Sequence, residues 1–220
     1  IPLFEGLAPR LGMGFSAAVL PQCPWPHGLR YASSTQDCVD AQAAWYGAVI
    51  EAIDPDVVVL AHRAVDDPAS PVPVVADGTG WLDPGTDEFE SILRDHATRT
   101  VDFLRDLGAR VVVIEPVPIV ASEDDPVECL SLEVGVAPCR FVANRSTLPS
   151  EQITRDLAAT RDDVWSVDLD QATCPHLPIC DPLVDGVVVR RDNTHLTATF
   201  VRTLVDAMEA YFVENGIVSR

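Results

Sequence analysis

Short runs of consecutive apolar residues alternate along the chain with longer stretches in which apolar positions recur every three or four residues. The short runs are typical of strands that are buried on both faces, and the longer period is typical of amphipathic helices. The pattern predicts strands at 15–20, 57–61, 111–114, 164–168 and 187–189, and helices at 1–11, 35–53, 88–107, 149–160 and 198–215.

Strands and helices alternate in this order, which favours a parallel sheet covered by helices. The 220 residues are enough for one such domain with a single core. We therefore predict an α/β fold, a three-layer sandwich with a mostly parallel central sheet, as a single domain over residues 1–220. Proline and glycine are frequent in segments 21–34 and 65–86, which we predict to be irregular loops.

Acidic residues outnumber basic residues by 34 to 15, and every basic residue is an arginine, so the formal net charge is −19. Such a surface repels phosphate backbones and anionic lipids, which argues against nucleic-acid binding and against adsorption to an anionic membrane by charge. No apolar run reaches the roughly 18 residues that a membrane-spanning helix needs. The first residue is Ile1 rather than an initiator methionine, from which we expect a mature or excised part of a longer protein.

The cysteines form three pairs of short sequence separation: Cys23 with Cys38, Cys129 with Cys139, and Cys174 with Cys180. An even number of cysteines in proline-rich loops, without a Cys-x-x-Cys motif, indicates disulfide bonds and an oxidising compartment. Local pairing needs the least rearrangement of the chain, although the sequence leaves other connectivities open. The competing interpretation is a zinc site, which His176 supports. Because a closed structural zinc site needs four well-spaced ligands, we predict no metal and no cofactor.

Asp192 and His195 lie three residues apart, directly before the last predicted helix. At this spacing both side chains can face one cleft while the carboxylate stays close enough to orient the imidazole. A general base that activates a hydroxyl nucleophile needs this arrangement. The alternative is that Asp192 or Thr194 caps the helix and that His195 is an ordinary surface residue, since Asp and Thr are favoured N-caps.

The segment from Asp192 to Thr197 resembles the Asp-x-x-His-Leu block of SGNH hydrolases. Other segments are similar to one branch of that family, the extracytoplasmic SGNH domains attached to membrane acyltransferases of family 3. These segments are the Cys-Pro-Trp loop (23–25), the Pro-Asp-Val-Val-Val-Leu strand (55–60), the Val-Ile-Glu-Pro-Val-Pro turn (113–118) and the cysteines at 174 and 180. The resemblance covers essentially the whole chain and implies an SGNH/flavodoxin-like fold.

The resemblance also implies a Ser-His-Asp site, in which His195 is the general base and Asp192 orients the imidazole. The family's nucleophile lies in a Gly-Asp-Ser block after the first strand, and no Gly-Asp-Ser occurs in this chain. The helix predicted at 1–11 corresponds to the helix that follows this block. We therefore expect that the first strand and the nucleophilic serine lie outside residues 1–220.

Three further residues are candidates for substrate contacts. The family's oxyanion-hole Asn block follows its third strand, which corresponds to the strand predicted here at 57–61; after that strand this chain has His62 and Arg63 and no Asn. Arg63 is a candidate donor to a developing oxyanion; the alternative is that it pairs with Asp66 or Asp67. Trp25 and Trp81 lie in predicted loops, where they are candidates for stacking on sugars.

The resemblance implies an extracytoplasmic O-acyltransferase or esterase that acts on acyl groups of a cell-envelope glycan. The expected partners are the acylated glycan or acyl-acceptor sugar and an integral-membrane acyltransferase domain of the same parent protein, which would tether the domain to the membrane. The alternative is a non-catalytic module of such an acyltransferase that binds or positions the glycan.

Overall fold

The structure is a computed structural model that describes residues 1–19, 22–76, 80–121, 125–132, 135–144 and 146–219. The contacts within the chain divide it into two compact units. The sheet unit comprises Leu20–Val117 and Ser146–Leu169. The terminal unit comprises Ile1–Val19, Pro118–Arg145 and Asp170–Arg220.

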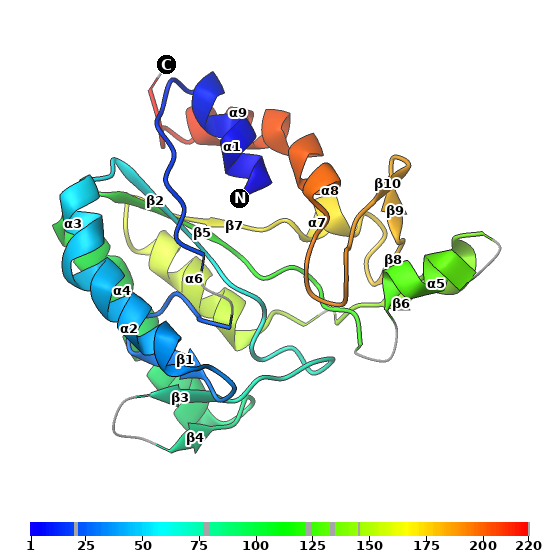
Figure 1. Cartoon of the computed structure of the whole chain (residues 1–220), viewed down its shortest axis with the longest axis horizontal. Coiled ribbons are helices and arrows are strands. Elements are labelled where there is room, and N and C mark those ends of the chain that lie inside the picture. Colours follow the sequence, from blue (N-terminus) through cyan, green and yellow to red (C-terminus); the bar gives the residue numbers. More distant parts are fainter. Residues whose placement is uncertain (20–21, 77–79, 122–124, 133–134, 145, 220) are drawn as a thin grey trace. The chain divides into compact units, whose positions relative to one another are not determined.

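A parallel sheet forms the centre of the sheet unit (Figure 1). Its strands are β2 (Val57–Ala61), β5 (Arg110–Ile114) and β7 (Val164–Val167), in the order β2-β5-β7. Both pairings are parallel, and the three central valines of β5 are fully buried. These apolar runs were predicted as buried parallel strands, and the structure confirms that prediction.

Amphipathic helices accompany this sheet. The long helix α4 (Asp87–Asp106) begins at Thr86, whose hydroxyl accepts a hydrogen bond from the Phe89 backbone N–H. Its apolar stripe packs with residues of β5 and α6 in one hydrophobic core. The remaining helical segments of the sheet unit are α2 (Gln36–Ala44), the π-helical turn η1 (Trp45–Val49), α3 (Ile50–Ile53) and α6 (Pro149–Ala159). The predicted fold class, α/β with a parallel sheet flanked by helices, is confirmed.

A second, antiparallel sheet lies in the segments that were predicted to be loops. It consists of β1 (Leu29–Tyr31), β3 (Val74–Ala76) and β4 (Trp81–Leu82), in the order β1-β3-β4. Each strand has only two or three residues and is flanked by proline or glycine. A run of this length is too short to show an alternating pattern, which is why the sequence prediction of loops at 21–34 and 65–86 was wrong for these residues.

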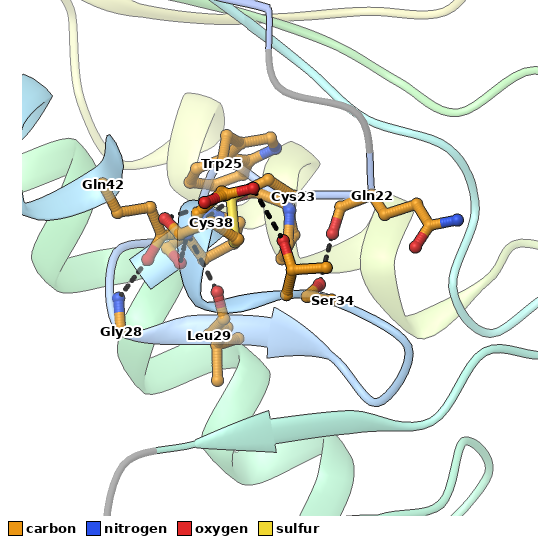
Figure 2. The surroundings of a disulfide bond; sticks show 12 residues. Gln22, Cys23, Trp25, Gly28, Leu29, Ser34, Cys38 and Gln42 are labelled. Atoms are coloured by element: carbon orange, nitrogen blue, oxygen red, sulfur yellow. Dashed lines mark hydrogen bonds between the residues drawn. A yellow bond between two sulfur atoms is a disulfide. The ribbon is translucent and has the colours of Figure 1, made fainter. Parts of the chain in front are cut away.

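A disulfide and a buried glutamine hold the loop that leads into β1. Cys23 is bonded to Cys38, and Figure 2 shows the Gln42 side chain reaching from α2 into the loop beside this bond. The Gln42 amide nitrogen donates to the carbonyls of Pro24 (2.8 Å) and Leu29 (2.9 Å), and its oxygen accepts from the Gly28 N–H (3.0 Å). These contacts fix the position at which β1 begins.

Glu115 is a buried carboxylate at the end of β5. Its side chain is 4% exposed, and both oxygens accept hydrogen bonds from Arg155 of α6 at 2.6–3.0 Å. Ser166 of β7 donates to the same carboxylate at 2.6 Å. The network therefore joins β5, α6 and β7 through one buried charge.

Replacing Arg155 by alanine is expected to lower the free energy of unfolding by about 3 kcal/mol, because the Glu115 carboxylate would remain buried without its counter-charge. Urea unfolding measures the change. The matched control is Arg99→Ala, which breaks an ion pair with Asp95 whose two side chains are about 60% exposed and should cost less than about 1 kcal/mol. Equal losses in the two variants would contradict this prediction.

The terminal unit contains the helices at the two ends of the chain, α1 (Pro2–Arg10), α8 (Ala198–Thr203) and α9 (Val205–Glu214). Gly6 allows α1 to approach Val205 closely, because a Cβ atom at this position would lie 3.1 Å from a methyl group of Val205. Arg10 pairs with Asp206 and Glu209 of α9. The helix predicted at 1–11 is confirmed, and the helix predicted at 198–215 forms in two parts.

Two strand pairs complete this unit: β6 (Phe141–Val142) with β8 (Ile179–Cys180), and β9 (Leu183–Val184) with β10 (Val187–Val188). Its other helical segments are α5 (Pro126–Leu132), the 3-10 turn η2 (Ala137–Cys139) and α7 (Asp170–Thr173). The strand predicted at 187–189 therefore exists, but in an antiparallel hairpin. None of the helices in the described part of the chain is both long and apolar enough to cross a membrane.

The buried strand predicted at 15–20 is wrong for its described residues. Residues 15–19 are exposed and form no strand, and Leu20 lies outside the described residues. An apolar run forms a strand only where a neighbouring strand satisfies its backbone N–H and C=O groups. In the described structure residues 15–19 pair with no strand.

Candidate active site

The candidate site lies in a closed turn of the terminal unit. The turn follows the β9–β10 hairpin, whose tip residues Asp185 and Gly186 both have positive φ, as a two-residue hairpin turn requires. The backbone N–H of Arg191 donates to the His195 carbonyl at 2.8 Å, and the N–H of Thr197 donates to the Val189 carbonyl at 2.9 Å. The chain thus returns on itself between Val189 and Thr197.

The Asp192 carboxylate organises the interior of this turn. One of its oxygens accepts hydrogen bonds from the backbone N–H groups of Thr194 (3.0 Å) and His195 (2.8 Å). Both oxygens lie 2.9 Å from Nδ1 of the His195 imidazole. Partial burial alone would raise the pKa of Asp192, but these hydrogen bonds and the nearby imidazole outweigh it and hold the pKa well below its ordinary value. The carboxylate is therefore ionised at neutral pH.

The His195 imidazole reaches solvent, with 66% of its side chain exposed. An ionised carboxylate can only accept hydrogen bonds, so Nδ1 of the neutral ring carries the proton and Nε2 presents a lone pair. No hydrogen bond to Nε2 is present among the described residues. The Asp192–His195 dyad, as we call this pair, therefore has the geometry of an oriented base whose accepting nitrogen is open to a substrate or nucleophile.

The helix cap and the dyad are built from different residues. The N-cap of α8 is Thr197, whose hydroxyl accepts from the Phe200 N–H at 3.1 Å and donates to the Val188 carbonyl at 2.5 Å. The alternative that Asp192 or Thr194 caps this helix is therefore wrong. The Asp192 carboxylate contacts the His195 imidazole and does not cap α8.

Asn193 anchors the turn, a role that the sequence analysis did not identify. Its side-chain nitrogen donates to the Ala121 carbonyl at 2.6 Å, and its own carbonyl accepts from the Val120 N–H at 3.1 Å. The Thr194 hydroxyl adds contacts to the dyad, 3.1 Å from His195 Nδ1 and 3.3 Å from Asp192. Nothing in the sequence indicates the two Asn193 contacts, because they depend on a segment about 70 residues away.

Arg63 of the sheet unit is held by its own loop. Its Nη2 donates to the carbonyl and the hydroxyl of Ser70 at 2.9 and 2.8 Å, and its Nε donates to the Ala64 carbonyl at 3.2 Å. Of the two suggested partners, Asp66 instead accepts from the N–H and hydroxyl of Ser150, and Asp67 accepts from the Ala69 N–H. A role for Arg63 as an oxyanion donor stays a prediction.

The two candidate tryptophans differ in exposure. Trp25 is 8% exposed and belongs to the hydrophobic core of the sheet unit, where its ring contacts His62 edge-on with the centroids 5.7 Å apart. A buried indole offers no face to a sugar, so the prediction for Trp25 is wrong. Its place in a proline-rich loop suggested exposure, but the Cys23–Cys38 disulfide and Gln42 fold that loop inward. Trp81 is 72% exposed.

His62 follows β2, and burial lowers its pKa to about 4. In the unfolded chain the same group titrates near pH 6.5. Between these two values the unfolded state binds a proton that the native state does not, so stability falls as the pH decreases from 6.5 to 4. We expect His62→Gln to reduce this slope in urea unfolding at a series of pH values. His176→Gln, at an exposed position, is the control; an unchanged slope in His62→Gln would contradict the prediction.

The structure pairs the six cysteines locally, as Cys23–Cys38, Cys129–Cys139 and Cys174–Cys180. Because every cysteine is in a disulfide, no cysteine thiolate is available as a zinc ligand. The alternative of a zinc site at His176 therefore loses its cysteine ligands. Within the described residues no group of His, Cys, Asp and Glu side chains has the arrangement of a metal site.

Comparison with known proteins gives a family and a similar solved structure. A family model described as the SGNH domain that is fused to AT3 domains matches residues 1–210. Among solved structures, the chain is similar to the lipopolysaccharide acetyltransferase periplasmic domain of Salmonella ser. Paratyphi A, with a TM-score of 0.60 and 15% sequence identity over 96% of this chain and 78% of that chain. At this identity the likeness concerns the fold. No curated protein matches the sequence.

Proposed function

Because this chain belongs to the family of SGNH domains that are fused to AT3 domains, we propose that it transfers or hydrolyses acyl groups of a cell-envelope glycan outside the cytoplasm. The observation that carries the proposal is the Asp192–His195 dyad, in which an ionised carboxylate orients an exposed imidazole. The structural neighbour, which is named as a lipopolysaccharide acetyltransferase domain, supports acetyl as the acyl group and a glycan as its acceptor.

In the proposed mechanism a serine attacks the acyl carbonyl while His195 Nε2 removes the hydroxyl proton. The tetrahedral intermediate collapses, and the protonated imidazole returns the proton to the leaving oxygen. This step leaves an acyl-enzyme ester. A sugar hydroxyl or water, deprotonated by the same imidazole, then attacks the ester and releases the serine. Throughout, Asp192 holds the imidazole in one tautomer and stabilises its charged form.

We place the nucleophilic serine in a part of the parent protein outside these 220 residues, since the chain has no Gly-Asp-Ser block. Arg63 is the proposed donor to the developing oxyanion. The proposed partners are the acylated glycan or acyl-acceptor sugar and an integral-membrane acyltransferase domain of the same protein, as the fusion to AT3 domains in this family suggests. The three disulfides favour an extracytoplasmic location.

The test is the reaction of the full-length protein with p-nitrophenyl acetate. We expect release of nitrophenol above the uncatalysed rate, together with an increase in intact mass that corresponds to one acetyl group on a serine. The alternative function is a non-catalytic module that binds or positions the glycan. This alternative predicts neither the acetyl adduct nor turnover of the ester. A result with neither would therefore contradict the proposed enzyme and support the binding module.

A further inference from the structure

Three residues stand in one row on the outer face of the small antiparallel sheet in the sheet unit. Arg30 of β1 lies opposite Val75 of β3, and Val75 lies opposite Trp81 of β4. Residues that are directly opposite in an antiparallel sheet share a face. The neighbouring positions on these strands point to the other face, where they are buried in the core: Leu29, Tyr31, Val74, Ala76 and Leu82.

The exposure of this row is unusual. Trp81 is 72% exposed, although it lies in a strand and carries the largest apolar side chain of any amino acid. Val75, between the two long side chains, is 8% exposed. Since adjacent strands lie about 4.8 Å apart, Arg30 and Trp81 stand roughly 10 Å from each other across the valine. This span accommodates one sugar ring with a substituent.

Arg30 also differs from most arginines of this acidic chain. In the described structure no hydrogen bond or ion pair engages its guanidinium. Eight other arginines bind carboxylates: Arg10, Arg94, Arg99, Arg105, Arg140, Arg155, Arg161 and Arg191. Acidic residues outnumber arginines by more than two to one in the sequence. An arginine that lies half-buried on the outer face without an acidic partner is therefore a cation available to a ligand.

The backbone beneath the row is held in place before any ligand binds. The Gln42 side chain forms hydrogen bonds with Gly28 and Leu29, where β1 begins, beside the Cys23–Cys38 disulfide (Figure 2). Gly28 has a φ of 82°, and a Cβ atom there would lie 3.0 Å from the His96 ring, so this position requires glycine. The Ala32 N–H extends the pairing of β1 by donating to the Pro73 carbonyl at 2.8 Å. A platform on such a backbone loses little entropy on binding.

We propose that Arg30, Val75 and Trp81 form a carbohydrate-binding platform for a sugar that carries a carboxylate, that is, a uronic acid residue of a glycan. The indole face stacks against the C–H face of the sugar ring, as aromatic side chains do with flat apolar surfaces. The guanidinium binds the carboxylate through two parallel hydrogen bonds. A carboxylate is planar and projects from the edge of its ring, so a ring that is stacked on Trp81 directs it towards Arg30.

The platform rests on the proposed function only in that its glycan would belong to the same cell-envelope polymer. Binding can be measured without catalysis. The full-length protein is titrated by calorimetry with two probes of equal length, tetragalacturonate and neutral maltotetraose. We expect tighter binding of tetragalacturonate, an affinity about tenfold lower for both probes in Trp81→Ala, and a smaller loss in Trp81→Phe, which keeps an aromatic face.

Arg30→Gln tests the charge. It should weaken tetragalacturonate binding about tenfold and leave maltotetraose binding unchanged. Arg99→Gln, which changes an exposed arginine of the same unit, is the matched control and should leave both affinities unchanged. Unaltered affinity in Trp81→Ala, equal weakening of both probes by Arg30→Gln, or no binding of tetragalacturonate at millimolar concentration would each overturn the platform.

A change of oligomeric state in Trp81→Ala, seen by sedimentation, would also overturn the platform, because it would assign this face to self-association. If the ester assay shows no turnover while tetragalacturonate binding behaves as expected, the proposed enzyme fails and the platform stands. The reverse result removes the platform and leaves the enzyme.

Discussion

Replacing His195 by alanine in the full-length protein should reduce the turnover of p-nitrophenyl acetate by at least about 10³-fold. Without the imidazole no group of the dyad can remove the proton from the nucleophile, and loss of the base in serine hydrolases is of this size or larger. Initial rates at saturating ester measure the effect. Because the imidazole is 66% exposed, the variant should keep the melting temperature of the parent.

His176→Ala is the matched control for this variant. His176 is an exposed histidine of the same unit, and its loss should leave turnover unchanged. Activity of His195→Ala within tenfold of the parent, with folding intact, would remove the dyad from the mechanism. The nitrophenol release would then have to come from another residue.

Asp192→Asn should lower kcat by about 10² to 10⁴-fold with little change in KM. The side chain keeps its size, but its amide can donate a hydrogen bond to Nδ1 and so favour the tautomer whose Nε2 carries a proton. That tautomer cannot act as a base. Rates over a range of ester concentrations separate kcat from KM. An increase in KM with unchanged kcat would mean that Asp192 contributes to substrate binding and not to the base.

The same variant has a signature in the pH dependence of stability. The native pKa of Asp192 lies below its ordinary value of 3.8, so the carboxylate stabilises the fold fully at pH values above 3.8. This contribution decreases as the pH falls from 3.8 towards the native pKa, because in that range the unfolded state binds a proton that the native state does not. The difference in unfolding free energy between the parent and Asp192→Asn should therefore be constant near neutral pH and narrow below pH 3.8. A difference that does not depend on pH would contradict this assignment.

The sequence predicts best what local contacts decide. Helices with a clear apolar period, such as 88–107, appear in the structure within one residue of their predicted ends. The dyad was predictable for the same reason, since Asp192 and His195 are three residues apart and bond each other within one turn. The family resemblance that these residues carry is confirmed by the match over residues 1–210.

Distant contacts decide the features that the sequence did not predict. The strands β1, β3 and β4 are too short to show a period, and they form because their inward side chains fill the core beside α4. Trp25 is buried because Gln42 of α2 binds the loop that contains it. Asn193 becomes an anchor only when the Ala121 carbonyl lies beside it. No pattern within a few residues of these positions contains that information.

The closed turn between Val189 and Thr197 has a consequence for how such a site can diversify. Carboxylate and imidazole are aligned by hydrogen bonds within their own turn, so the orientation of the base is set within one short segment of the chain. Substitutions elsewhere can change the surroundings of the imidazole without altering its orientation. Acceptor choice and proton-transfer chemistry can therefore evolve as separate traits.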